Sequence, residues 1–91
     1  MQVEKILIIE SPVRLFKIMD SKNEIFDLAS SPVYHRLMGF CDRVRLFLNG
    51  CKCDEEENYS EMMREYSNIQ NDSESISHLS SCIGCDRIEF K

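Results

Sequence analysis

Four of the five cysteines in this 91-residue chain lie in two short pairs. One residue separates Cys51 from Cys53, and two residues separate Cys82 from Cys85. Zinc prefers four soft or borderline ligands at tetrahedral corners, and proteins usually supply them as two chelating pairs from distant parts of the chain. The spacing therefore predicts one structural zinc site made of Cys51, Cys53, Cys82 and Cys85.

The same cysteines permit two other interpretations. Cysteine is among the most buried residue types, so the pairs can be plain thiols that pack as small apolar side chains. The Cys82/Cys85 pair can also be a disulfide or a redox pair, although a strand is predicted after it, where a helix N-terminus would be needed to activate a thiolate. A Cys-x-x-Cys pair before a strand resembles half of a zinc ribbon, a resemblance too short to imply a function. His78 lies one helical turn before Cys82 and could replace Cys51 or Cys53 as a ligand.

A run of acidic residues follows the first cysteine pair. Residues 54–57 are DEEE, and further glutamates follow on the same predicted helix. Carboxylates in a first turn suit the positive end of the helix dipole, and such a run usually forms a solvated face. We select four of these residues as contacts for a protein partner with a basic surface: Glu55, Glu56, Glu61 and Glu65.

The first third of the chain is predicted to be mainly β-structure. Residues 3–9 form a β-branched apolar run that indicates a buried strand. Partial alternation over 13–19 and 24–29, on either side of the turn-forming sequence DSKN, favours a β-hairpin. The alternative is a short helix with Ser11 as its N-cap and Pro12 in its first turn.

The clearest helix is predicted over residues 31–50, between a Ser-Pro start and an Asn-Gly end. Cys41 lies on its apolar side, which places this cysteine in the core. Leu46 is the one apolar residue on its polar side. The apolar side covers about half of the circumference and contains Val33, Tyr34, Leu37, Met38, Phe40, Cys41, Val44, Phe47 and Leu48.

Two further helices and a strand complete the predicted elements. A second helix begins after Asp54, in a pattern that resembles a capping box. A short third helix follows the sequence NDSES at 71–75, and the alternating sequence DRIEFK at 86–91 predicts a terminal strand. The apolar stripe of the second helix consists of Tyr59, Met62, Met63, Tyr66 and Ile69.

These elements predict a single α+β domain over residues 1–91, a length at which chains rarely divide. We expect a small antiparallel sheet made of the N-terminal strand, the hairpin and the C-terminal strand. The sheet would pack on two amphipathic helices and a short third helix.

The distribution of charge bears on the class of partner. The net charge is −5, with +1 through residue 50 and −6 from residue 51 onward. Nucleic-acid binders usually carry a basic face, so direct nucleic-acid binding is not expected. The longest apolar run near the N-terminus, residues 6–9, is too short for a signal sequence or a membrane span. We therefore expect a cytoplasmic protein that does not bind membranes.

The sequence carries little that indicates catalysis. Its three glycines are isolated, so it has no glycine-rich phosphate loop, and we expect no enzyme. The leading hypothesis is a small cytoplasmic protein-interaction or adaptor domain, stabilised by the four-cysteine zinc site and able to self-associate. One alternative is an acidic inhibitor that mimics nucleic acid in a basic protein groove. Another is a thiol-redox protein that uses the Cys-x-x-Cys pair.

Overall fold

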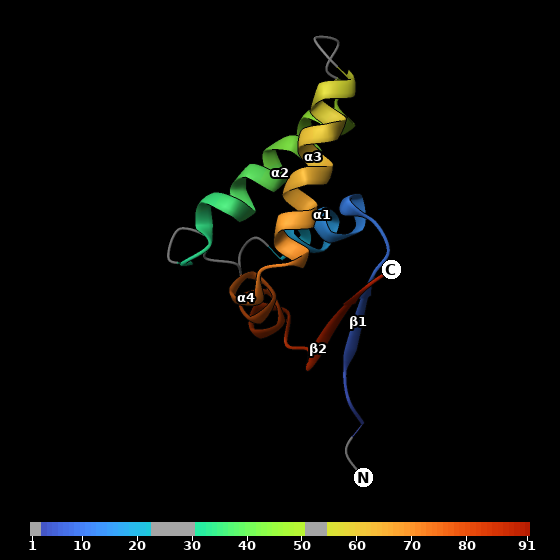
Figure 1. The fold of residues 1–91 in the computed structure, drawn as a ribbon. Helices are drawn as coiled ribbons and strands as arrows, with labels where there is room; N and C mark the ends of the chain where they lie inside the picture. The colour runs from blue at the N-terminus through green and yellow to red at the C-terminus, as the bar shows by residue number, and fades with distance from the viewer. Residues whose placement is uncertain (1–2, 23–30, 51–54) are drawn as a thin grey trace.

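The computed structural model describes residues 3–22, 31–50 and 55–91. Within them the chain forms two strands and four helices, and α2 and α3 lie side by side as an antiparallel helical hairpin (Figure 1). The sheet and α4 lie at one end of this hairpin, and the C-terminal end of α2 and the N-terminal end of α3 lie at the other (Figure 1). The elements are β1 (Ile6–Ile9), α1 (Pro12–Ser21), α2 (Tyr34–Leu48), α3 (Glu55–Gln70), α4 (Ser73–Ile83) and β2 (Arg87–Phe90).

The sheet corrects the predicted topology. Strands β1 and β2 pair in parallel, with Ile6 opposite Arg87 and Ile9 opposite Phe90. The predicted antiparallel sheet is therefore wrong, and the described residues form a mostly helical α+β fold. Parallel pairing requires a connection that returns the chain to the end from which it started, and the helical segment between the two strands provides it. Nothing in the local pattern of a strand specifies the direction of a partner strand 81 residues away in the sequence, as from Ile6 to Arg87.

The predicted hairpin is also wrong over its first half, because α1 forms there. The Ser11 hydroxyl accepts a hydrogen bond from the Arg14 backbone N–H at 3.1 Å, and Pro12 occupies the first turn. The structure thus has the short helix that the sequence offered as the alternative, with Ser11 as its N-cap and Pro12 in its first turn. The second half of the hairpin, residues 24–29, lies outside the described residues. The buried side chains of α1 are Leu15, Phe16 and Met19.

The other predicted helices and the terminal strand are confirmed. α4 begins at Asp72, whose carboxylate accepts the Glu74 backbone N–H at 3.3 Å, and ends at Gly84 with φ of 80°. That left-handed conformation lets the backbone N–H groups of Gly84 and Cys85 both donate to the Ser80 carbonyl, at 2.9 and 3.1 Å. The chain then turns directly into β2.

Aromatic rings connect the helical hairpin to the sheet. The Phe40 ring of α2 stacks on the Tyr66 ring of α3 with centroids 5.9 Å apart, and the Phe90 ring of β2 meets Tyr66 edge-on at 5.7 Å. Phe40 and Tyr66 are 0% and 5% exposed, so this contact lies in the centre of the core. The core also contains Ile9, Leu15, Phe16, Met19, Val33, Leu37, Cys41, Val44, Met62, Ile69, Leu79 and Ile88.

A polar junction holds the start of α4 against α2. The Asp72 carboxylate accepts a hydrogen bond from the fully buried Ser75 hydroxyl at 2.6 Å and forms an ion pair with Arg36. The Ser75 hydrogen bond, aided by the Arg36 guanidinium and the Glu74 backbone N–H, lowers the pKa of the Asp72 carboxyl below its usual value. The corner between α3 and α4 is thereby linked to α2.

Candidate functional site

The predicted zinc ligands fall in two different situations. Cys51 and Cys53 lie outside the described residues. Cys82 is in the last turn of α4, Cys85 follows that helix, and both are partly buried free thiols. Among residues 3–22, 31–50 and 55–91, no group of three or more histidine, cysteine or acidic side chains is placed to hold a metal ion. The four-cysteine zinc site therefore stays a prediction.

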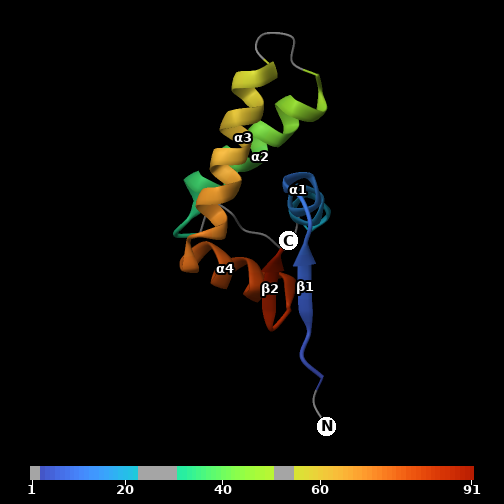
Figure 2. The same cartoon turned by 45° about the vertical axis from the view of Figure 1, so that its right-hand side comes forward.

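The described neighbours of the two cysteine pairs lie far apart. The ends of α2 and α3 that flank residues 51–54 lie at one end of the helical hairpin, and α4 lies beyond its other end (Figures 1 and 2). α3 has 16 residues, which at 1.5 Å per residue gives a length of about 24 Å. Zinc-bound sulfurs lie only about 2.3 Å from the metal. A shared four-cysteine site would have to bridge this separation.

Two of the three described thiols, those of Cys41 and Cys82, are held away from the reactive thiolate form. Cys82 Sγ lies 3.5 Å from His78 Nε2 across one turn of α4. Burial nevertheless raises the pKa of the Cys82 thiol, and it raises the pKa of Cys41 to about 11. Because the thiolate is the reactive form, both groups are held in the less reactive state at neutral pH. Cys41 lies in the core, in agreement with the sequence prediction.

Two of the four predicted acidic contacts have described side chains, and both are partly buried. Glu61 is partly buried and forms an ion pair with Arg64 on the same helix. Glu65 is also partly buried, and its carboxylate lies beside α2, where a Cβ added to Gly39 would be 3.8 Å from Oε2. Glu65 therefore lies on the side of α3 that borders α2. The side chains of residues 55–56, the other two predicted contacts, lie outside the described part of the chain.

Sequence analysis missed an exposed apolar surface at the end of the helical hairpin. Phe47 and Tyr59 were predicted to lie in the core, yet they are 42% and 49% exposed, with ring centroids 6.0 Å apart. The core ends about one turn farther from the apolar end of the hairpin, at Val44 of α2 and Met62 of α3. These two residues are 0% and 2% exposed. Leu46, on the predicted polar side of its helix, is 40% exposed. We call the following four residues the apolar tip: Leu46, Phe47, Leu48 and Tyr59.

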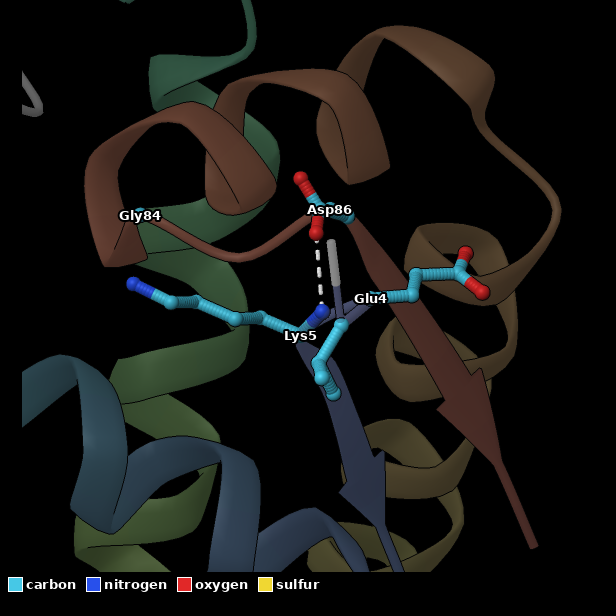
Figure 3. Close-up of a pocket in the computed structure, with 5 residues that line it drawn as sticks. Glu4, Lys5, Gly84 and Asp86 are labelled. Carbon is cyan, nitrogen blue, oxygen red and sulfur yellow. Dashed lines mark hydrogen bonds between the residues drawn. The ribbon is translucent and has the colours of Figure 1, made fainter. Parts of the chain in front are cut away.

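A hollow of about 570 Å³ lies at the opposite end of the molecule, where β1 begins (Figure 3). The backbone N–H of Lys5 donates to Asp86 Oδ2 at 2.7 Å, which joins the start of β1 to the turn before β2. The Lys5 and Glu4 side chains extend in different directions from this point. The contact aligns the two strands, and the charged groups around it do not converge on a common centre. Its lining residues are Val3, Glu4, Lys5, Gly84 and Asp86.

No protein-family model, curated protein or solved structure matches this chain. Within the described ranges, none of the helices is both long enough and apolar enough to cross a membrane. Among the described residues, the apolar tip is the surface feature that core packing does not explain.

Proposed function

We propose that this chain is a small cytoplasmic protein-interaction domain that docks a protein partner through the apolar tip. The observation that carries the proposal is the exposure of four large apolar side chains, each between 40% and 49%, at the end of one helical hairpin. Contiguous apolar surface rimmed by polar residues is typical of protein contact sites, whereas scattered single residues need no explanation.

The aromatic pair would form the centre of the contact. Phe47 and Tyr59 already touch across α2 and α3 and so present one rigid surface from two helices. Aromatic side chains dominate the binding energy of many interfaces because they bury a large area with few rotatable bonds. Each square ångström of apolar surface removed from water contributes about 25 cal/mol, before the costs of association.

The charge near the apolar tip indicates the chemistry of the partner. The sequence beside it is acidic from residue 54 to residue 57, and the Glu57 side chain is exposed. We infer an apolar pocket bordered by lysine or arginine on the partner. Charges at the rim of an interface mainly accelerate association and select the partner, and salt screens them.

A paired set of variants tests this proposal. The tagged full-length chain and a Phe47→Ser/Tyr59→Ser variant would be used to capture proteins, which are identified and purified for calorimetric titration. We expect the double variant to weaken binding by about tenfold or more, since each buried aromatic typically contributes over 1 kcal/mol. Val3→Ser, at an exposed apolar residue that belongs to neither strand, should bind like the wild type. A purified partner that binds the double variant and the wild type equally would contradict the proposal.

The salt dependence of binding separates this proposal from the acidic-inhibitor alternative. An apolar contact should change little between low and high salt, because screening acts on charges. A mimic of nucleic acid would lose affinity steeply and would be insensitive to Phe47→Ser. That combination of results would favour the alternative over the apolar tip.

The zinc prediction has a separate test. Metal content of the freshly purified chain would be measured by mass spectrometry, with melting followed in the presence and absence of a chelator. One zinc per chain, lost in a Cys82→Ser variant together with several kcal/mol of stability, would support the four-cysteine site. A metal-free protein with freely titratable thiols and unchanged melting would rule it out.

A further inference from the structure

The outer edge of β1 carries backbone groups that face away from the sheet. The carbonyls of Lys5 and Ile9 accept hydrogen bonds from N–H groups within residues 86–91, so the backbone groups of these odd-numbered positions face β2. Along a strand that pairs in parallel on one side, alternate residues direct both N–H and C=O to the same edge. The backbone groups of Ile6 and Ile8 therefore face the opposite edge.

No described element covers that edge. In both Figure 1 and Figure 2, β2 lies on one side of β1 and none of the described helices lies on the other. Among the described residues, β1 pairs only with β2. An open row of backbone donors and acceptors is a template for another extended chain. Because a two-stranded sheet is only marginally stable, a third strand would also reinforce it.

The side chains along this edge form a simple pattern. Ile6 and Ile8 point to the same face of the sheet and are 41% and 40% exposed. Glu4 and Glu10 flank these residues at the same alternating spacing in the sequence, and both are exposed. The Glu4 carboxylate also forms an ion pair with Arg87 of β2 at 3.6 Å, whereas Glu10 lies beyond the end of β2. The strand and its flanks therefore present two aliphatic side chains between two carboxylates, at alternating positions.

We propose that the outer edge of β1 binds an extended segment of a protein partner as a third strand. The segment would place two apolar side chains beside Ile6 and Ile8, with a lysine or arginine at each end beside the carboxylates. The backbone edge selects an extended chain, because no other conformation offers alternating donors and acceptors at this spacing. The carboxylates select basic flanks by charge complementarity.

Charge also argues against a second copy of this chain as the occupant. Antiparallel pairing of two β1 strands that sets Ile6 opposite Ile8 would set Glu4 opposite Glu10. Like charges directly opposite each other destabilise a strand pair. A basic-flanked partner turns the same two carboxylates into favourable contacts. Because this edge and the apolar tip lie at opposite ends of the molecule (Figure 2), the chain could hold two partners at once.

Synthetic peptides provide a direct test. A peptide with the sequence Lys-Thr-Ile-Thr-Ile-Thr-Lys, blocked at both ends, has the required pattern in either orientation. Two controls would replace its lysines with glutamates or N-methylate alternate amides, which blocks strand pairing. Binding to the ¹⁵N-labelled full-length chain would be followed by NMR titration. We expect shifts centred on β1, with each control weaker by about tenfold or more, equivalent to about 1.4 kcal/mol.

Protein variants locate the binding edge. Ile8→Pro removes an N–H that does not pair with β2, whereas Ile8→Thr keeps that N–H in a residue that suits a strand. We expect Ile8→Pro to abolish peptide binding and Ile8→Thr to retain it more weakly. Glu10→Lys should weaken the lysine peptide by about fivefold, and Glu74→Lys, the same charge change on an exposed residue of α4, should not.

Three outcomes would overturn the inference. They are peptide-induced shifts away from β1, equal affinity for the lysine and glutamate peptides, and a concentration-dependent dimer in ultracentrifugation that Ile8→Pro dissociates. The N-methylated peptide keeps the test valid even if Ile8→Pro unfolds the chain, since it leaves the protein unchanged. The Phe47→Ser/Tyr59→Ser variant should bind the peptide normally, so failure at β1 and failure at the apolar tip are distinguishable.

Discussion

The two ends of the α2–α3 hairpin contain the same aromatic pair in different surroundings. Phe40 stacks on Tyr66 at 5.9 Å, and two turns farther along both helices Phe47 meets Tyr59 at 6.0 Å. Each pair joins a phenylalanine of α2 to a tyrosine of α3. Yet the first pair is 0% and 5% exposed, whereas the second is 42% and 49% exposed. Contact between two helices is therefore not enough to bury their apolar side chains.

A third layer makes the difference. Phe90 of β2 packs edge-on against Tyr66, and α1 packs against both helices. At the other end, the described residues supply no such layer over Phe47 and Tyr59. Two packed elements enclose a core only when a further element closes the remaining side. The exposed pair is thus available to a partner.

The largest expected effect tests the covered end. Phe40→Ala should lower the free energy of unfolding by about 3–5 kcal/mol, because it leaves a cavity between α2 and α3. Urea unfolding monitored by circular dichroism would measure the loss. Phe47→Ala is the matched control on the same helix. Equal losses in the two variants would show that the two ends are packed alike and would break the comparison.

Asp72 tests whether the polar junction helps to hold the covered end together. Folding lowers the pKa of the Asp72 carboxyl below its usual value of 3.8. Its stabilisation is therefore complete above that value and is lost as the pH falls through the folded pKa. Asp72→Asn should therefore lower the melting temperature at pH 7, by less than Phe40→Ala. The difference from the wild type should shrink with acidification below the unfolded pKa. Asp42→Asn, at an exposed position of α2, should leave the melting temperature nearly unchanged, and a pH-independent difference at Asp72 would contradict this account.

Tyr66 provides a test of opposite sign. Its hydroxyl is buried and has no hydrogen-bond partner among the described residues, and burial raises its pKa. Removing an unsatisfied polar atom should help, so we expect Tyr66→Phe to raise the free energy of unfolding by about 1 kcal/mol. Tyr59→Phe, at the exposed end, should have no measurable effect. Loss of stability in Tyr66→Phe would mean that the hydroxyl makes a stabilising contact.

The smallest effect on stability is expected at the apolar tip. Phe47→Ala should change the free energy of unfolding by less than about 0.5 kcal/mol, as exposed substitutions usually do. The same variant should weaken partner binding, which calorimetry would measure. A large loss of stability together with unchanged binding would assign Phe47 to the core and remove the basis of the proposed function.

The elements were largely predictable from sequence because their ends depend on nearby residues. Asp72 and Gly84 bound α4 through hydrogen bonds within a few residues of each, and the sequence shows such signals directly. The error over residues 13–19 arose because a short apolar run with partial alternation also fits the inward face of a helix. At that position Ser11 and Pro12 indicated the helix more reliably than the apolar pattern did. Ser11 accepts a backbone hydrogen bond in the first turn, and Pro12 has a backbone angle that suits a helix start.

The candidate site was less predictable than the elements. The cysteine pairs and the acidic run were chosen by residue type and spacing. Neither property shows which side of a helix is packed against another element. Glu65 was chosen for its charge, and it lies beside Gly39 of α2. Phe47 and Tyr59 were assigned to the core because their periodicity matches that of Phe40 and Tyr66. The one sequence feature that indicated an exposed apolar surface was Leu46, an apolar residue on the predicted polar face of its helix.

The sequence by itself determined three of the four helices (α2, α3 and α4), the two strands and the acidic charge, because each of these depends mainly on residues close along the chain. Only the tertiary structure decided that β1 and β2 run in parallel, which leaves the edge of β1 open. It also decided which of two equivalent aromatic pairs is buried. Both outcomes depend on elements distant in sequence, whose arrangement no local pattern encodes.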